Sequence, residues 1–455
     1  MTMKPHLLIS VAVAGLFAGQ ASAAPLTSED TDRLLERLTQ LEQEVANLRS
    51  QLSNVEIEQQ EQTKLVTATQ QDVREVIVTT NQNKISWKGA PEIKSADGWS
   101  FKPRGRALID FANLSAPNAI NVPGEGFTNE ARRIRLGVQG KIPGGFGYKI
   151  EADFADGVEL TDAYLDYKAN DLTIIVGQHN NFQSLEELSS SNDTSFIERS
   201  AFTDAFGFQR KVGISAAWAK GDILLQGGVF TDNIDDLSDG NDSIGLDGRV
   251  VFAPKIGPSQ LHFGGSVHWR DLGDTITSVR YRQRPLVHTV DTRFINTGNI
   301  SGATDEMSYG LEAAVISGRF HAAAEGHWNK VSRIAMPNPT FFGGSIEAGI
   351  FLTDDSREYK GGVFKGTKVK NPVGQGGSGA WQFNIRYDRL DLVDAGIIGG
   401  TQDGYMASII WTPVNHVRFL VNYGHLNYGN ALGIVGGAPN NYSVDVVGAR
   451  AQVSF

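Results

Sequence analysis

Nine residues near the end of the chain, Val447-Gly448-Ala449-Arg450-Ala451-Gln452-Val453-Ser454-Phe455, alternate between apolar and small or polar side chains. A period of two is typical of a β-strand, whose successive side chains point to opposite faces. In a soluble sandwich the apolar face meets a core, whereas in a membrane barrel it meets lipid and the other face meets water. This stretch therefore predicts a strand but does not by itself distinguish the two architectures.

The number of similar segments favours the membrane barrel. The same alternation recurs at 261–269, 320–328, 381–387 and 417–423. About sixteen such segments lie between Trp99 and Phe455, so we predict an all-β fold, a transmembrane antiparallel β-barrel of about sixteen strands with an aqueous lumen. Tryptophans near predicted strand ends suit aromatic girdles at the membrane interfaces, although each could instead belong to a core. They are Trp99, Trp218, Trp269, Trp328, Trp381 and Trp411.

The N-terminal stretch indicates export. Lys4 precedes an apolar run at 7–17 and then the small-residue site Ala21-Ser22-Ala23, which is the pattern of a cleaved secretory signal peptide, residues 1–23. The run is too short for a membrane-spanning helix, which needs about 20 apolar residues. Phe455, which closes an alternating strand, resembles the assembly signal of outer-membrane barrels. These features predict the Gram-negative outer membrane as the location, with membrane lipid and lipopolysaccharide as partners.

Residues 24–60 are rich in Leu, Glu and Gln, and their apolar positions follow the alternating four- and three-residue spacing of a coiled coil. These positions are Leu34, Leu38, Leu41, Val45, Leu48, Leu52 and Val55. A coiled coil requires partners, so this periplasmic segment predicts a homo-oligomer, and a homotrimer is the natural state for a porin. The alternative is a lone amphipathic helix lying on the barrel. Residues 61–98 are expected to form a polar linker before a barrel at 99–455.

Composition and motif searches narrow the functional classes. The chain has 455 residues, a net charge of -10 and no cysteine, and this acidity argues against a nucleic-acid partner, since phosphate binding depends on clustered Lys and Arg. Glu186, Glu187 and the serines at 189–191 have no histidine at a spacing that predicts a catalytic triad. His262 and His268 lack the helical spacing of a zinc motif. We therefore expect no catalytic residue, no metal, no cofactor and no enzymatic activity.

Basic side chains cluster on the polar faces of the first two predicted strands. Guanidinium groups that face a lumen attract anions, and their planar fork suits phosphate and carboxylate. The predicted anion path consists of Lys102, Arg104, Arg106, Arg133 and Arg135. A structural alternative remains open, because acidic residues on neighbouring strands could neutralise these charges by ion pairing. Those residues are Glu151, Asp153, Asp162 and Asp166.

Three stretches between predicted strands, 180–209, 271–303 and 353–376, are long. Loops of more than about 12 to 15 residues are usually functional or disordered. The first is the candidate constriction loop, because one such loop folds inward in porins. Its candidate pore residues are His179, Glu186, Glu187, Glu198 and Arg199. The second stretch carries four arginines that we expect to be solvated, to contact lipopolysaccharide or to form an extracellular funnel. They are Arg280, Arg282, Arg284 and Arg293.

Ordered motifs give the chain a family resemblance. They lie at 87–91 (WKGAP), 98–106 (GWSFKPRGR), 132–137 (RRIRLG), 162–167 (DAYLDY), 176–178 (VGQ), 184–190 (SLEELSS), 196–199 (FIER), 281–285 (YRQRP), 297–298 (TG) and 347–353 (EAGIFLT). As an ordered set they are similar to the phosphate- and polyphosphate-selective porin family, of the porin O and P type, over residues 87–455. The resemblance implies a trimer of sixteen-stranded barrels and an inward-folded third loop that begins just after Gln178.

One stretch departs from the family pattern. Where members commonly carry a Lys, this chain has Gly177-Gln178-His179-Asn180-Asn181-Phe182, and a histidine is only partly charged near neutral pH because its unperturbed pKa is about 6.5. We therefore predict a porin for passive diffusion of small hydrophilic solutes and ions, with a modest preference for anions such as phosphate. The alternatives are a non-conducting envelope-tethering or structural barrel that works through its coiled coil, and an outer-membrane lipase or protease.

Overall fold

The computed structural model describes residues 28–82, 84–118, 120, 122–431 and 440–455. The signal peptide expected at 1–23 lies outside the described residues. The chain divides into two compact units, Met1–Asn81 and Gln82–Phe455. The first is helical where it is described, and the second is a β-barrel.

The first unit contains one long helix, α1 (Ser28–Gln82). It continues through residues 61–82, which the sequence predicted to be part of a linker, because that stretch contains neither Gly nor Pro to end the helix, although ten of its 22 residues are β-branched. The seven apolar positions of the predicted coiled-coil seam are exposed, from 47% for Val45 to 65% for Leu52. Their pairing with other copies therefore stays a prediction. No described helix is both long and apolar enough to cross a membrane.

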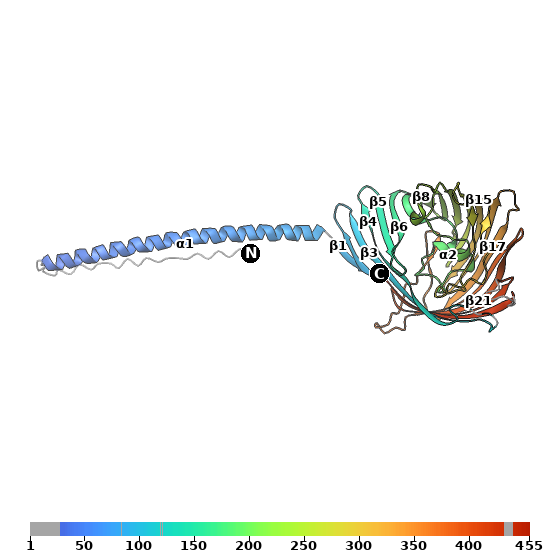
Figure 1. The fold of residues 1–455 in the computed structure, drawn as a ribbon. Coiled ribbons are helices and arrows are strands. Elements are labelled where there is room, and N and C mark those ends of the chain that lie inside the picture. Colours follow the sequence, from blue (N-terminus) through green and yellow to red (C-terminus); the bar gives the residue numbers. More distant parts are fainter. Residues whose placement is uncertain (1–27, 83, 119, 121, 432–439) are drawn as a thin grey trace. The chain divides into compact units, whose positions relative to one another are not determined.

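The second unit is a closed barrel of sixteen antiparallel strands, as the alternation predicted. Each strand pairs with its neighbours along the chain, and β23 returns to β3 from the pair Asp445 and Ser115 to the pair Ser454 and Arg106, which closes the ring (Figure 1). The strands are β3 (Ser100–Ser115), β4 (Gly126–Ile142), β5 (Phe146–Asp153), β6 (Glu159–Ala169), β7 (Leu172–Asn180), β8 (Arg210–Lys220), β9 (Ile223–Phe230), β10 (Ile244–Phe252), β12 (Ser259–Asp271), β15 (Ala303–Ser317), β16 (Phe320–Arg333), β17 (Thr340–Phe351), β20 (Ala380–Asp394), β21 (Ile397–Val414), β22 (Val417–Gly429) and β23 (Tyr442–Ser454).

Shorter elements surround this ring. A hairpin follows α1 in the remaining part of the expected linker, and its second strand pairs with β3 through Ile93 and Phe101. The short elements are β1 (Lys84–Lys88), β2 (Ala90–Lys94), α2 (Leu185–Leu188), α3 (Ala201–Ala205), η1 (Ile234–Asp236), β11 (Lys255–Ile256), β13 (Ser278–Val279), β14 (Ile300–Ser301), β18 (Glu358–Lys360) and β19 (Val363–Lys365). The first strand of the ring, β3, begins at Ser100.

The two faces of each strand differ in the way a membrane barrel requires. On β20, Phe383 and Ile385 are exposed on the outer face, whereas Asn384 and Arg386 are buried on the lumen side. Further along the same strand the lumen positions become apolar, beginning with Leu390. An apolar outer band matches lipid, and a polar inner face matches an aqueous lumen. The apolar stretch of the inner face would be exposed to water unless another apolar surface inside the barrel covered it.

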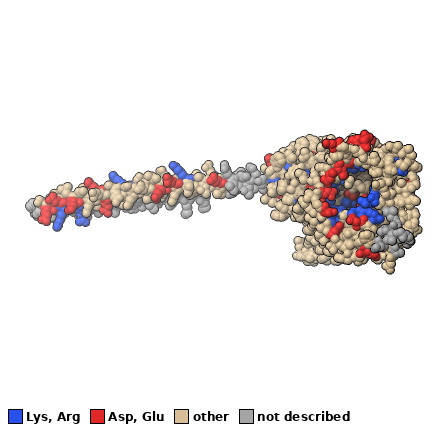
Figure 2. Space-filling view, viewed as in Figure 1, with Lys and Arg blue, Asp and Glu red and all other residues tan. Residues whose placement is uncertain are grey.

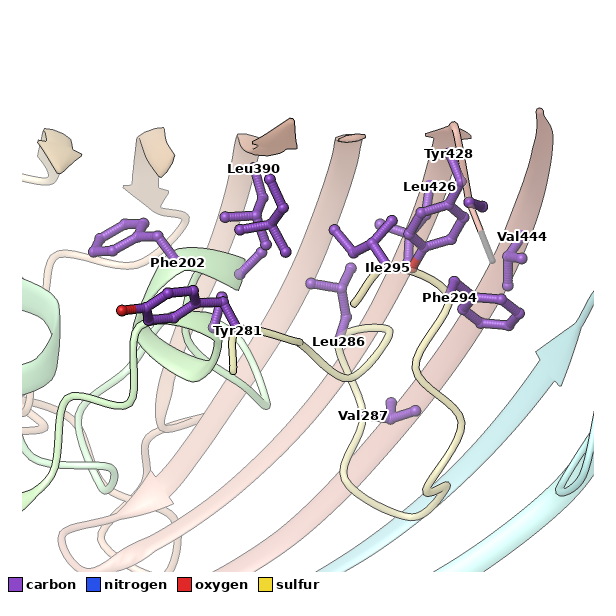
Figure 3. Packing of buried hydrophobic residues seen from close by; sticks show 14 of the residues in the cluster. Phe202, Tyr281, Leu286, Val287, Phe294, Ile295, Leu390, Leu426, Tyr428 and Val444 are labelled. Carbon is purple, nitrogen blue, oxygen red and sulfur yellow. The ribbon is translucent and has the colours of Figure 1, made fainter. Parts of the chain in front are cut away.

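The chain itself provides that surface, because two connections at one end of the barrel fold into the lumen. They are the inner loop (residues 181–209, between β7 and β8) and the second inner loop (residues 272–302, between β12 and β15). In the second inner loop, Leu286 and Phe294 are buried in one cluster with Leu390 and Leu426 of the wall (Figure 3). The sequence pattern did not predict this inward position, and burial of the loop's apolar side chains holds it inside the ring.

A third segment enters from the opposite end. The connections there are otherwise short, such as the turn at 318–319, as is usual at the periplasmic side of such barrels. The exception is the hairpin segment (residues 352–379, between β17 and β20), which carries β18 and β19. Its Val363 and Phe364 are buried with Leu185 of the inner loop. The lumen is therefore narrowed from both ends.

Candidate functional site

A cavity large enough to hold water remains beside the inner loop. It is a cavity of about 640 Å³, the basic cavity, bounded by strands β3 to β8, the inner loop and part of the second inner loop. Its described lining includes ten Lys or Arg side chains but only five Asp or Glu side chains. Figure 2 shows charged side chains of both signs gathered around this opening. The whole chain has a net charge of -10, so the positive excess here is a local arrangement.

Most of the residues singled out from the sequence line this cavity. Of the predicted anion path, four arginines do so, whereas Lys102 does not. The four are Arg104, Arg106, Arg133 and Arg135. Of the candidate constriction residues, Glu186 faces away, and the other four line the cavity. Those are His179, Glu187, Glu198 and Arg199.

Acidic residues hold several of these arginines, as the structural alternative proposed. Glu151 lies 3.6 Å from Arg106 and 3.7 Å from Arg135, measured between carboxylate oxygen and guanidinium nitrogen. Asp153 accepts a hydrogen bond of 2.7 Å from Arg135 Nε. Arg106 also donates to the Ser191 hydroxyl at 3.0 Å. The charge of these two arginines is thus largely compensated within the wall.

Arg133 is different. Its side chain is only 8% exposed and lines the basic cavity, yet it has no hydrogen bond and no ion pair with any described residue. A guanidinium carries five donor N–H groups, and a buried cation without a partner is energetically unfavourable. An anion in the cavity would supply the missing acceptor.

A β-bulge adds an arginine that strict alternation did not predict. The register of β3 and β4 shifts so that Leu108 pairs with Arg133 and Ile109 with Ala131, which leaves Arg132 as the extra residue. Because a bulge re-aims side chains, both Arg132 and Arg133 line the cavity. Two adjacent arginines in a membrane strand were a usable signal, since alternation would have placed one of them in lipid.

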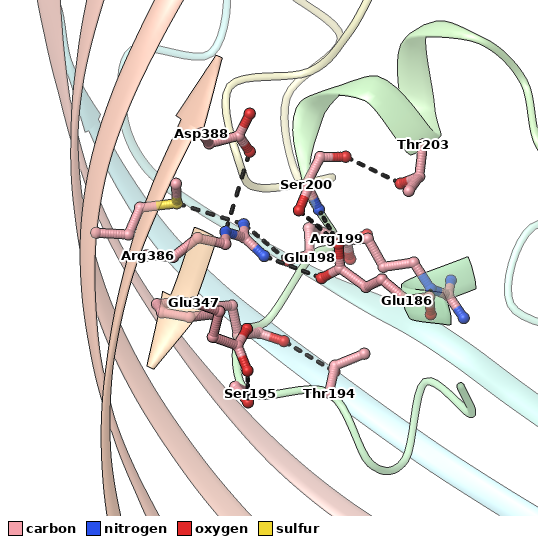
Figure 4. Close-up of polar contacts among 12 residues, drawn as sticks. Glu186, Thr194, Ser195, Glu198, Arg199, Ser200, Thr203, Glu347, Arg386 and Asp388 are labelled. Carbon is pink, nitrogen blue, oxygen red and sulfur yellow. Dashed lines mark hydrogen bonds and ion pairs between the residues drawn. The ribbon is translucent and has the colours of Figure 1, made fainter. Parts of the chain in front are cut away.

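The inner loop is fastened across the lumen by wall residues from distant parts of the chain (Figure 4). The Glu325 carboxylate accepts hydrogen bonds of 2.8 Å from the backbone N–H groups of Leu185 and Glu186. Asp388 accepts one of 2.8 Å from the Ala201 N–H. Glu186 pairs with Arg386 at 3.1 Å, which explains why it faces the wall. These bonds fix the loop as one boundary of the basic cavity.

Arg199 has a structural role inside the loop. Its guanidinium donates to the backbone carbonyls of Glu186, Glu187 and Ser189 at 3.0, 3.2 and 2.9 Å. It also lies 3.4 Å from the Glu187 carboxylate. Burial nevertheless raises the pKa of Glu187, because the neighbouring arginines offset only part of the cost of burying a carboxylate.

His179 does not replace the cation that the family commonly carries. The ring is 4% exposed, with Nδ1 2.9 Å from the Gly177 carbonyl oxygen and Nε2 2.7 Å from the Ser215 hydroxyl. A carbonyl can only accept, so Nδ1 donates, and Nε2 is satisfied by accepting from the hydroxyl. Both nitrogens therefore have partners with the ring neutral.

Three further cations line the cavity although sequence reasoning did not single them out. Lys149 and Arg210 both pair with Asp162, at 2.5 and 3.0 Å. Lys365 comes from β19 of the hairpin segment, so no local pattern could place it there. Among the described residues no group of three or more His, Asp or Glu side chains could hold a metal ion.

Comparisons with known proteins agree with this geometry. A family model described as phosphate-selective porin O and P matches residues 101–455. An uncharacterized protein of Caulobacter vibrioides is 47% identical over 383 residues, which are 82% of this chain and 77% of the relative. The outer membrane channel DcaP of Acinetobacter baumannii is similar in structure at a TM-score of 0.50 and 14% identity, over 80% of this chain and 99% of that one. OprB of Pseudomonas putida reaches a TM-score of 0.51 at 10% identity, over 79% and 95%.

The two solved structures share the barrel fold with this chain. Because their sequence identities to it are low, we infer only the fold from them. The family model is more specific, because it spans most of the chain and includes the strands that line the basic cavity. It confirms the resemblance seen in the motifs: the chain belongs to the phosphate-selective porin O and P family.

Proposed function

We propose that this chain is an outer-membrane diffusion porin whose lumen modestly prefers anions, phosphate among them. The observation that carries the proposal is the buried guanidinium of Arg133, which faces the basic cavity without an ion-pair or hydrogen-bond partner among the described residues. Membership of a porin family supports a channel as its biochemical class. The unpaired guanidinium of Arg133 supports a preference for anions over cations.

The electrostatics of the cavity support both the preference and its modest size. A water-filled cleft with an excess of one charge concentrates the opposite ion at its entrance. However, Glu151, Asp162 and Glu198 hold most of the surrounding cations in ion pairs. Only part of the positive charge is therefore available. Weak sites of this kind suit conduction, since a site that bound an anion tightly would stop its passage.

Phosphate is a suitable anion for the Arg133 site. The planar fork of a guanidinium donates two parallel hydrogen bonds to two oxygens of one phosphate or carboxylate. Ser190 also lines the cavity, and its hydroxyl, which accepts from the Asn192 N–H at 3.3 Å, can still donate its own hydrogen. Chloride can use the positive charge but not the fork, so phosphate should occupy this site longer than chloride.

We further propose a homotrimer in the outer membrane, exported with a cleaved signal peptide. The exposed apolar seam of α1 supports assembly, because such a seam is buried when helices of several copies pack together. OmpT of Vibrio cholerae, which shares the fold at a TM-score of 0.50, has been solved in a trimer form. The exposed apolar outer face of the barrel supports contact with lipid and lipopolysaccharide.

One observation favours a second candidate function, a non-conducting tether. Helix α1 has 55 residues, which corresponds to about 80 Å at 1.5 Å per residue, and three segments narrow the lumen. Single-channel recording in planar bilayers separates the two functions. Discrete ion currents support the porin, and a correctly folded barrel without current supports the tether.

The sign of the selectivity is tested by the reversal potential in a potassium chloride gradient. We expect the wild type to prefer chloride over potassium, and Arg133→Gln to lower that preference. The matched control is Lys220→Gln, which removes the same charge from an exposed position outside the cavity lining. A wild-type preference for potassium, or an equal effect of both variants, would contradict the proposal.

A further inference from the structure

The inner loop separates two cavities within the barrel. Beside the basic cavity lies a second cavity of about 270 Å³, and Gly207, Phe208 and Gln209 line both. The rest of its lining comes from β8, β12, β15, β16, the start and the α3 end of the inner loop, and the second inner loop. None of the residues predicted for the anion path is among the described residues that line it.

Most of the charges around the second cavity compensate one another. Lys211 lies 3.4 Å from Asp232, and Arg270 donates to the same carboxylate at 2.5 Å. Arg270 also reaches Glu306 at 3.3 Å. Arg280 also lines the cavity and has no acidic partner among the described residues, so three cations face two carboxylates. This positive excess is smaller than that of the basic cavity, so the second cavity attracts an anion less strongly.

Several buried polar groups at this cavity have no protein partner. The side chains of Asn181 and Gln183 are among its lining, are 2% and 3% exposed, and make no hydrogen bond within the described residues. The Nε of Arg270 is also buried without a partner there. Buried polar groups are nearly always satisfied, so these groups require water or a solute in the cavity.

An aromatic wall completes the cavity. Phe206 and Tyr281 both line it, with ring centroids 6.0 Å apart in an edge-to-face arrangement. The Tyr281 hydroxyl donates to Glu306, which fixes the ring. Aromatic rings next to a few convergent polar groups are the usual composition of a small-molecule site.

We infer that the second cavity binds a neutral solute of about monosaccharide size that carries several hydroxyl groups. A hydroxyl both donates and accepts, as do the amides of Asn181 and Gln183, so the two can pair in either direction. Phosphate oxygens chiefly accept, so they could pair with Arg270 and Arg280 but not with the amide oxygens or the Glu306 carboxylate, whereas a hydroxyl can pair with all of these groups. The apolar ring face of a sugar can pack against Phe206 and Tyr281. This site is separate from the anion site and adds a second class of permeant to the proposed function.

The test uses the full-length protein in proteoliposomes, with D-glucose as the neutral probe and gluconate as the anion of the same carbon skeleton. We expect glucose influx to saturate with concentration. The double variant Asn181→Leu and Gln183→Met keeps the side-chain size but removes the amides. It should lower glucose influx at low concentration by about fivefold or more, the effect of losing one or two hydrogen bonds. Gluconate should not compete with glucose for this site.

Matched variants keep the result interpretable. Chloride conductance of the double variant should stay within about twofold of the wild type, which also shows that the barrel has folded and inserted. Arg133→Gln should change chloride selectivity and leave glucose influx unchanged. Influx that rises linearly with glucose concentration, or that is equal in wild type and double variant, would overturn the inference. A wild-type pore that shows saturable glucose influx but no preference for chloride would instead contradict only the proposed anion preference, so the two failures are distinguishable.

Discussion

Arg132 and Glu198 meet across the lumen through two hydrogen bonds, 2.7 Å from Nε to Oε1 and 3.2 Å from Nη2 to Oε2. Arg450 approaches the same carboxylate at 3.1 Å. Burial by itself would raise the pKa of Glu198, but Arg132, Arg133 and Arg450 outweigh it and hold the pKa well below its usual range. The pKa of a Glu in the unfolded chain is about 4.3. Because the pKa of Glu198 is lower in the folded protein, its ionised carboxylate stabilises the folded state at pH values above 4.3, and this stabilisation is lost as the pH falls through the folded-state pKa.

Neutralising Glu198 should therefore make the pore more selective for anions. Glu198→Gln removes a negative charge from the cavity lining and leaves Arg132 without its carboxylate. We expect the chloride-to-potassium permeability ratio, measured from reversal potentials, to rise by roughly twofold or more. The control Asp222→Asn removes the same charge from an exposed turn and should have no effect. A fall in the ratio would show that Glu198 acts mainly by positioning the loop.

Selectivity should also depend on pH through Glu187, whose pKa burial raises. As pH falls from neutral through this raised pKa, Glu187 gains a proton and the cavity loses a negative charge, so anion preference should increase. Glu187→Gln should show the higher preference already at neutral pH and should lack that part of the increase. The measurement is the reversal potential between about pH 7 and pH 4, a range that ends near the unperturbed value for Glu. Identical pH profiles for variant and wild type would rule out this role.

The anchor at Glu325 should control the order of the inner loop. Glu325→Ala removes the acceptor of the Leu185 and Glu186 N–H groups, and each hydrogen bond to a charged group contributes about 1.5–3 kcal/mol. We expect hydrogen exchange at these two amides to accelerate by at least about tenfold. The open-channel current should also become noisier. Glu358→Ala, at an exposed position of the hairpin segment, serves as the control, and equal exchange in both variants would refute the anchor role.

Packing of the second inner loop should contribute to barrel stability. Phe294 is fully buried in the lumen, so Phe294→Ala should lower the free energy of unfolding by roughly 3–5 kcal/mol. Phe263→Ala makes the same change on the outer face, where the ring is 51% exposed in the single chain. Its effect in detergent micelles should be smaller. Urea titration measures both, and equal losses would mean that the loop packs only loosely.

The sequence pattern predicted those features that depend on local periodicity. Alternation was sufficient to predict the strands and the lumen position of Arg104 and Arg106. It failed at Arg132, because a bulge interrupts the period by one residue. An arginine facing the middle of the bilayer costs about 2–4 kcal/mol, so the adjacent pair Arg132 and Arg133 was the available signal for the bulge.

Features that depend on long-range packing were not predictable in the same way. We expected the four arginines of the second inner loop to be solvated, to contact lipopolysaccharide or to form an extracellular funnel, and made no prediction that the loop itself folds into the lumen. Its apolar pairs, Leu286 with Val287 and Phe294 with Ile295, were the signal that it folds inside. The inward position of Lys365 depends on a hairpin that meets the inner loop only in the assembled barrel. No local sequence pattern predicts that contact between the hairpin segment and the inner loop.

The fastening of the inner loop constrains the order in which the barrel can fold. Glu325, Asp388 and Arg450, which hold the loop, follow it in sequence by 140, 187 and 252 residues. Such high contact order predicts slow folding, because the chain must close long loops before these contacts form. The inner loop cannot reach its final position until the last strands have been added. Closure of the ring between β23 and β3 and the completion of the selective passage are therefore one kinetic event, and a barrel that has not yet closed has no defined selectivity.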